Sequence, residues 1–184
     1  THRLVFLAAI PFVLGVVVRV RVEGLLRLRL YLAFRHYLSP DVIRDLMKDP
    51  NALRLGGDRE IVTLLFSDIR GFTALSEAQP PEELTRFIND YFTRMTAAVT
   101  RHGGYLDKYI GDGIMALFGA PVTTEDARVH AHQACRAALD MQAALAPVNE
   151  TWRERGLPEV RIGVGVNTGE AIVGNMGAET RFNY

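Results

Sequence analysis

The segment Ile61–Thr73 constrains the fold more than any other part of the sequence. Its first six residues, Ile61–Phe66, are apolar or β-branched, which is typical of a buried β-strand. A strand of this composition is usually covered on both faces, and we expect that here. Asp68 follows where the strand leaves the core, and Gly71 then permits a tight turn and a close approach of the backbone to a ligand.

The carboxylate of Asp68 has two explanations. An acid at a strand end beside a glycine turn is a common arrangement for holding a divalent cation. A turn or a helix cap explains a single aspartate at such a place equally well. Asp68 alone therefore does not define a site.

A second segment, Gly103–Gly119, changes this balance. It predicts a β-hairpin with strands Tyr105–Ile110 and Ile114–Phe118, because Asp-Gly between apolar runs is a strong hairpin signal. Turn chemistry alone would explain Asp112, but two acids at strand tips in one small domain favour a shared role. Together, Asp68 and Asp112 can hold two Mg²⁺ or Mn²⁺ ions, which bind a triphosphate and activate an attacking oxygen.

These segments resemble the catalytic domain of class III nucleotidyl cyclases, the adenylate and guanylate cyclases. F-S-D-I-R-G-F-T at Phe66–Thr73 is similar to the first metal motif of the family, and D-K-Y-I-G-D-G-I-M-A-L-F-G at Asp107–Gly119 to the second. A third block comprises Asn167–Gly177 and then Arg181–Tyr184. The resemblance covers Arg59 to the end and is to the membrane-anchored bacterial adenylate cyclase type.

The order of expected elements is strand, helix, hairpin, helix, strand. This is the ferredoxin-like, split βαβ layout of an α+β domain, and it agrees with the palm-like fold that the resemblance implies. We expect an amphipathic helix from Pro80-Pro81-Glu82-Glu83, with an apolar stripe that packs in the core. The stripe consists of Leu84, Phe87, Ile88, Tyr91, Met95, Ala98 and Val99.

After the hairpin, Thr124 is expected to cap a second helix that runs to about Leu145. We expect His130 and His132 at the surface, since no third ligand stands at zinc spacing. Strands are expected at Pro158–Val166 and, after a Thr168-Gly169 turn, at Glu170–Val173. The expected apolar stripe of the second helix is Ala127, Ala131, Ala134, Cys135, Ala138, Leu139 and Leu145.

The N-terminal part differs in character from the rest. Leu4–Val18 carries no charge, and the arginines after it form a positive-inside flank. We expect the C-terminal part of a transmembrane helix at residues 1–19, a cell-membrane location and a cytoplasmic catalytic domain. A buried soluble helix or a signal-peptide core is the alternative, although no small-residue cleavage site follows.

Residues 20–57 are expected to connect this helix to the catalytic domain at 58–184. Val20–Leu38 fits both a strand alternation and a helix, of which the helix is the simpler interpretation. A second helix start, with Ser39 as cap and Pro40 at its first position, resembles the transducer element of sensor-linked cyclases. Asp49–Asp58 is expected to be a linker.

Composition limits the remaining possibilities. The chain of 184 residues suits one domain, and its formal net charge of zero gives no basic field that would indicate nucleic acid. The single cysteine, Cys135, excludes an internal disulfide and suits a reducing compartment. A place on a helix face explains Cys135 better than catalysis does.

The resemblance implies a role for each site residue. Asp68, Asp112 and the Ile69 carbonyl would bind the two metal ions, and the backbone amides of Gly71, Phe72 and Thr73 would meet phosphate oxygens. The substrate would be ATP, which is cyclised to 3′,5′-cyclic AMP and pyrophosphate at a homodimer interface. The resembled domains continue beyond the position of Tyr184 with residues that orient the ribose and stabilise the transition state, so we expect this chain alone to be weakly active or inactive.

Lys108 is the residue from which we predict whether the substrate base is adenine or guanine. In the resembled family a lysine here recognises adenine, whereas guanylate cyclases tend to have glutamate. A lysine only donates, and adenine N1 accepts, while guanine N1–H and its amino group need an acceptor. A non-catalytic regulatory cyclase-homology domain, a guanylate cyclase and a diguanylate cyclase are the alternatives; Lys108 opposes the guanylate reading, and the absence of a G-G-D-E-F-like hairpin opposes the last.

Overall fold

The computed structural model describes residues 15, 18–26, 28–29, 32, 56–120, 126–178 and 181–183. The chain divides into two units, residues 1–54 and 55–184. The second unit holds every sheet and helix that bears on the site.

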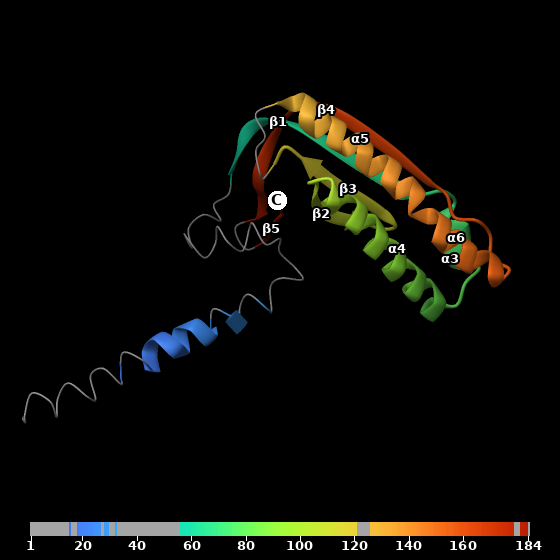
Figure 1. Cartoon of the computed structure of the whole chain (residues 1–184), viewed down its shortest axis with the longest axis horizontal. Coiled ribbons are helices and arrows are strands. Elements are labelled where there is room, and N and C mark those ends of the chain that lie inside the picture. The colour runs from blue at the N-terminus through green and yellow to red at the C-terminus, as the bar shows by residue number, and fades with distance from the viewer. Residues whose placement is uncertain are drawn as a thin grey trace, which may run out of the picture. The chain divides into compact units, whose positions relative to one another are not determined.

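This second unit is built on one antiparallel sheet with the strand order β2-β3-β1-β4-β5. The first four strands have the ferredoxin-like order, so the predicted α+β, split βαβ fold is confirmed. Helices α4 and α5 lie side by side on one face of the sheet (Figure 1). The elements are β1 Gly56–Ile69, α3 Phe72–Glu77, α4 Pro81–Arg101, β2 Tyr105–Ile110, β3 Gly113–Phe118, α5 Ala127–Ala143, α6 Leu145–Glu154, β4 Ile162–Ala178 and β5 Arg181–Asn183.

Helix α4 packs as its pattern predicts. Its acidic first turn at Glu82 and Glu83 suits the positive end of the helix dipole, and Pro81 stands at its first position. The two partly buried members of the predicted stripe, Leu84 and Ile88, complete the contact with the core. Its fully buried residues are Phe87, Tyr91, Met95, Ala98 and Val99.

Helix α5 agrees with the predicted stripe only in part. Ala134 and Leu145 are buried and Ala138 is partly buried, as predicted, but Leu139 is 72 % exposed and Cys135 is exposed, so these two lie outside the core. Alanines occur around much of this helix, and an alanine fits either face, so the stripe was poorly defined by sequence. The buried residues are His130, Ala134, Ala137 and Met141.

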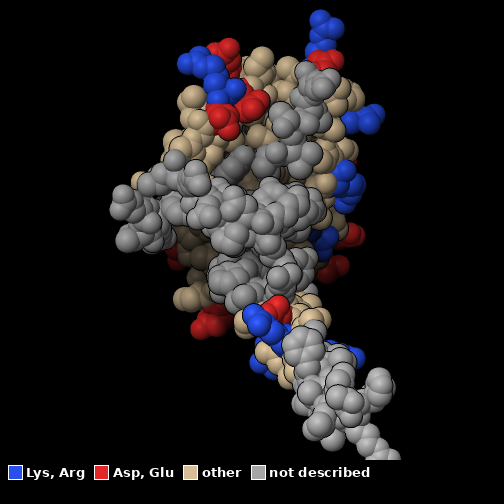
Figure 2. Space-filling model, turned by 90° about the vertical axis from the view of Figure 1, so that its left-hand side faces the viewer, with Lys and Arg blue, Asp and Glu red and all other residues tan. Residues whose placement is uncertain are grey.

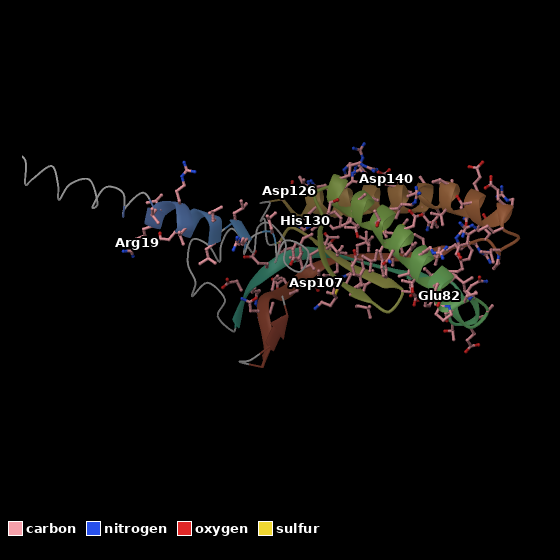
Figure 3. All side chains as sticks on the ribbon, turned by 90° about the horizontal axis from the view of Figure 1, so that it is seen from below. Arg19, Glu82, Asp107, Asp126, His130 and Asp140 are labelled. Atoms are coloured by element: carbon pink, nitrogen blue, oxygen red, sulfur yellow. The ribbon has the colours of Figure 1, made fainter. Side chains whose placement is uncertain are left out.

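The prediction that His130 lies at the surface is wrong. The residue is 1 % exposed, and Figure 3 shows it where α5 meets the sheet. Its Nδ1 lies 2.7 Å from the Thr63 hydroxyl, which in turn lies 2.8 Å from the hydroxyl of Thr168. These neighbours satisfy a polar ring in the core, which explains why burial costs little here. His132 is exposed, as predicted.

The central strand is covered along one face and only in part along the other, which corrects our expectation of two covered faces. Thr63, Leu65 and Ile69 are buried on the side of the helices, whereas on the opposite side Val62 is buried but Phe66 is 45 % exposed. The helices pack on one side of the sheet, so the opposite side, around Phe66, remains open in the described part of the chain. We call this side the open face.

The cap of α5, the presence of α6 and the continuity of β4 also differ from the prediction. Asp126 caps α5 by accepting from the Arg128 amide at 2.8 Å, whereas Thr124 lies outside the described residues. Helix α6 was not predicted. Strand β4 runs without a break through Thr168 and Gly169, where we expected a turn, because it pairs with β1 along its length.

Asn149 fixes α6 to the start of β4, and its removal should destabilise the domain. Its amide donates to the Val160 carbonyl at 2.9 Å, and its oxygen accepts from the Val160 amide at 2.7 Å. Asn149→Ala would leave two buried backbone groups unpaired, a loss of about 2–4 kcal/mol in the free energy of unfolding. Urea denaturation measures it, and Thr151→Ala on the exposed side of α6 is the control. An unchanged midpoint for Asn149→Ala would contradict this role.

The described part of the N-terminal unit is helical at residues 18–26, 28–29 and 32, which agrees with the helical interpretation of this segment. No helix among the described residues is both long and apolar enough to cross a membrane. Most of the predicted transmembrane segment, residues 1–19, and the predicted transducer helix lie outside the described residues. Most of the predicted linker, Asp49–Asp58, lies outside them too, but the prediction is wrong at its end, because Gly56–Asp58 already belong to β1 and pair with β4. The membrane location stays a prediction.

Candidate active site

The structure brings Asp68 and Asp112 together. Asp68 stands at the end of β1, and Asp112 lies in the loop between β2 and β3. Strand β3 pairs with β1, and the pair Ser67↔Ile114 brings the start of β3 beside the end of β1. The backbone N–H of Ile69 donates to Oδ2 of Asp112 at 3.0 Å. This hydrogen bond ties the hairpin loop to the strand end, so the two predicted acids share one place.

The pairing of β1 also aims the Ile69 carbonyl. The Arg70 N–H donates to the Arg161 carbonyl at 2.8 Å, so residues 70 and 161 form a hydrogen-bonded pair. Hydrogen bonds alternate along an antiparallel ladder, and therefore the backbone of Ile69, opposite Ile162, points away from β4. Its N–H reaches Asp112 on that side, and its carbonyl points the same way, toward the hairpin loop.

The two carboxylates influence each other. Partial burial raises the pKa of Asp112, a hydrogen bond with Asp68 and the charge of Asp68 raise it further, and the Ile69 N–H opposes the shift. Two acids this close favour a shared proton or a shared cation. The oxygen donors of this pair fit a hard divalent cation such as Mg²⁺ or Mn²⁺. Within the described residues, no group of three or more His, Cys, Asp or Glu side chains gathers as a metal cluster.

The raised pKa of Asp112 predicts the effect of a neutral replacement. The folded domain binds this proton at a higher pH than the unfolded chain does, so the associated stability is present in acid and is lost as pH rises through the folded pKa. In chelator at neutral pH, Asp112→Asn should therefore unfold at higher urea than the wild type, with a smaller change toward acid pH.

Asp140 provides the control of opposite sign. Hydrogen bonds from His102 and Arg101, each 2.8 Å long, lower the pKa of Asp140. Its stability contribution is present above the unfolded pKa and is lost as pH falls. Asp140→Asn should consequently destabilise the domain at neutral pH. A destabilising effect of Asp112→Asn in chelator would contradict the account of the acid pair.

The turn after the acids leads into α3. Gly71 has a φ of 72°, a left-handed conformation that glycine adopts without strain, and no side chain caps the helix. The first N–H groups of a helix have no partner within it. The amides of Phe72 and Thr73 therefore begin a helix whose first turn lacks a side-chain cap, which is an arrangement that suits a phosphate.

A row of small residues flanks Asp68 on the open face. Gly163 on β4 stands directly opposite Asp68. On the other side, a Cβ added to Gly113 would lie 3.6 Å from Oδ1 of Asp68. These glycines border an open hollow lined by Phe66, Ser67, Asp68, Ile110, Gly113, Ile114 and Gly163. The hollow gives a ligand access to Asp68.

Lys108 lies on β2, across from Met115. Since Met115 in turn pairs with Phe66, these residues share the open face, and Lys108 lies on the same face as Asp68. Its Nζ is 3.2 Å from Oδ2 of Asp107, whose side chain is 5 % exposed. Burial raises the pKa of Asp107, and Lys108 opposes this shift. Asp107 thus positions Lys108.

Sequence reasoning missed three residues beside the acids. Tyr91 and Ser67 are buried, and burial raises the pKa of Tyr91 to about 12. The Ser67 hydroxyl opposes this shift, although the two hydroxyls are not aligned as a hydrogen bond. Tyr91 had appeared only as one apolar position of α4. The third residue is Arg70, which stands inside the first metal motif.

Comparison with known proteins defines the class. Residues 57–184 match the family model described as the adenylate and guanylate cyclase catalytic domain. Adenylate cyclase 1 of Rhizobium meliloti is 36 % identical over 151 residues, which are 82 % of this chain and 22 % of the relative. The chain thus spans about a fifth of that relative's length.

Two solved structures are similar as well. The guanylyl cyclase Cya2 is 45 % identical, with a TM-score of 0.65 over 71 % of this chain and 64 % of that one. The adenylyl cyclase CyaB from P. aeruginosa is 39 % identical, with a TM-score of 0.67 over 71 % and 66 %. The chain belongs to the adenylate and guanylate cyclase catalytic-domain family. Its relatives include both an adenylyl and a guanylyl cyclase.

Proposed function

We propose that this chain is an adenylate cyclase domain that converts ATP to 3′,5′-cyclic AMP and pyrophosphate. The observation that carries the proposal is that Asp68 and Asp112 lie together. The N–H of Ile69, the residue after Asp68, donates to Oδ2 of Asp112 at 3.0 Å. In the reaction the ribose 3′-oxygen bonds to the α-phosphorus, and the bond from that phosphorus to the pyrophosphate oxygen breaks. The hydroxyl proton leaves to solvent, and pyrophosphate carries away the negative charge.

Asp68, Asp112 and the Ile69 carbonyl would hold two Mg²⁺ or Mn²⁺ ions. Such ions lower the pKa of an attacking hydroxyl and offset the charge of the phosphates. The amides of Gly71, Phe72 and Thr73 would bind phosphate oxygens at the start of α3. These residues orient the triphosphate for in-line attack, which is most of what phosphoryl-transfer catalysis requires.

The active unit would be a homodimer that packs through the open face. Phe66 and Ile110, at 45 % and 53 % exposure, are large apolar side chains on the same side of the sheet as Asp68. Lys108 belongs to this side too. Across a two-fold axis, the Lys108 of one protomer would meet the base of the ATP held by the acids of its partner.

Lys108 favours ATP over GTP as substrate. Its ammonium group only donates hydrogen bonds, which suits the N1 acceptor of adenine. Asp107 holds it at 3.2 Å, so the group approaches the base from a fixed place. A guanylate cyclase would need an acceptor at this position, and Lys108 provides none.

Turnover with ATP and GTP, each with Mn²⁺, tests the proposal. We expect cyclic AMP from ATP in clear excess over cyclic GMP from GTP. A larger yield of cyclic GMP would favour the guanylate alternative. Metal-dependent nucleotide binding without either product would favour the non-catalytic regulatory domain, which the paired acids also permit.

A further inference from the structure

Arg70 places its guanidinium in a space that a glycine leaves open. A Cβ added to Gly163 would lie 2.7 Å from Cζ of Arg70 and 2.8 Å from its Nε, closer than real Cβ atoms approach other groups. The guanidinium therefore lies against the backbone of β4 where any other residue would put a side chain. Gly163 acts here through the space that it leaves.

This contact sets the guanidinium on the β4 residue that stands opposite Asp68. Gly163 stands opposite Asp68 in the sheet and lines the same hollow. The backbone of Arg70 is fixed by its hydrogen bond to the Arg161 carbonyl at 2.8 Å. Among the described residues, no carboxylate lies within ion-pair distance of Arg70, although many of the surface charges in this chain are paired. Its charge is therefore available to a ligand at the edge of the hollow, beside Asp68 and Gly163.

We propose that Arg70, with its guanidinium packed against Gly163, binds the terminal phosphates of the nucleotide and the pyrophosphate product. This inference rests on the proposed function and adds a substrate-binding residue to it. A guanidinium presents a planar fork of N–H groups that matches two phosphate oxygens at once. Arg70 lies next in sequence to the turn whose amides would bind the same phosphates under the proposed function, so both would hold the leaving group while its charge grows.

Pyrophosphate binding measures this role without turnover. Titration calorimetry with Mg²⁺–pyrophosphate should show that Arg70→Met weakens binding by about tenfold to a hundredfold, the range for charge-assisted hydrogen bonds. Arg70→Lys keeps the charge but loses the fork, so we expect a smaller loss. The KM for ATP should rise in the same order.

Gly163→Ala and Gly165→Ala form a matched pair. Both lie on β4, and their partners Asp68 and Phe66 lie on the open face. A Cβ at Gly165 would meet nothing within 4 Å, whereas one at Gly163 would displace the Arg70 guanidinium. Gly163→Ala should weaken pyrophosphate binding severalfold and Gly165→Ala should not. In the Arg70→Met background, Gly163→Ala should have no further effect.

Two results would overturn the inference. In one, Arg70→Met leaves pyrophosphate binding unchanged and strengthens Mn²⁺ binding, which would mean that Arg70 only neutralises the acids. In the other, the effects of Gly163→Ala and Arg70→Met add, so that Gly163 acts independently. Loss of pyrophosphate binding in Arg70→Met, in a chain that forms no cyclic nucleotide, would support the inference while the proposed function fails.

Discussion

Replacing Asp112 by alanine is expected to lower the rate of cyclic AMP formation by about three orders of magnitude. In the proposed site the change removes one of the two carboxylates that would hold the metal ions, and a single electrostatic group of this kind is commonly worth ~10²–10³ in rate. It also removes the acceptor of the Ile69 N–H, which is 3.0 Å from Oδ2. Initial rates at saturating ATP and Mn²⁺ measure the effect.

Asp112→Asn separates the two roles of this side chain. Its amide oxygen still accepts from the Ile69 N–H, so the loop stays attached, but the negative charge is gone. We expect Asp112→Asn to lose activity almost as fully as Asp112→Ala. An asparagine variant with near wild-type activity would mean that Asp112 only fixes the loop, and the metal role would be wrong.

Replacing Lys108 by glutamate should shift the preference between ATP and GTP. The donor to adenine N1 becomes an acceptor for guanine, and one base contact of this kind discriminates by about 1–3 kcal/mol, or roughly tenfold to a hundredfold. Total activity should also fall, because the new carboxylate lies next to the buried Asp107, whose lysine partner is lost. The ratio of kcat/KM for ATP and for GTP measures the shift.

Two controls accompany Lys108→Glu. Arg136→Glu makes the same charge change at an exposed site on α5, on the other side of the sheet, and should leave the ratio unchanged. Mixing the Lys108→Glu chain with the Asp112→Ala chain should restore part of the ATP activity. A mixed dimer has one site with intact acids from one chain and an intact Lys108 from its partner. No restoration in verified mixed dimers would contradict the shared site.

The sequence predicted the acid pair because two acids stood at predicted strand tips, although neither aspartate alone defined a site. Asp68 follows an apolar strand, and Asp112 occupies an Asp-Gly turn between apolar runs. The helical i, i+3, i+4, i+7 spacing of Leu84, Phe87, Ile88 and Tyr91 likewise defined the buried face of α4. Where local pattern and tertiary contact agree, the structure followed the prediction.

Other features depended on contacts that local pattern does not encode. His130 can be buried because the hydroxyl of Thr63, 67 residues earlier in the sequence, lies at hydrogen-bond distance, 2.7 Å, from its Nδ1. Gly169 resembled a turn residue, yet β4 continues through it because β1 pairs with it throughout. The packing of the Arg70 guanidinium against Gly163 likewise arises only when β1 and β4 lie side by side.

The charges on the surface of the protein are mixed in sign. Acidic and basic side chains lie intermixed on the face drawn in Figure 2, which agrees with a formal net charge of zero. Such a surface supplies little long-range field of one sign. Under the proposed function, recognition of the anionic nucleotide would then come from the local groups of the site, namely ions held by the acids, the turn amides and Arg70.

The most direct test is the number of Mn²⁺ ions that the chain binds beside 3′-deoxy-ATP, which has no attacking hydroxyl. Electron paramagnetic resonance counts the free Mn²⁺ during a titration of the wild type and of Asp112→Asn. We predict two tightly bound ions per chain in the wild type and a clear loss in Asp112→Asn, because both acids hold the ions. The same number of equally tight ions in both proteins would contradict the account.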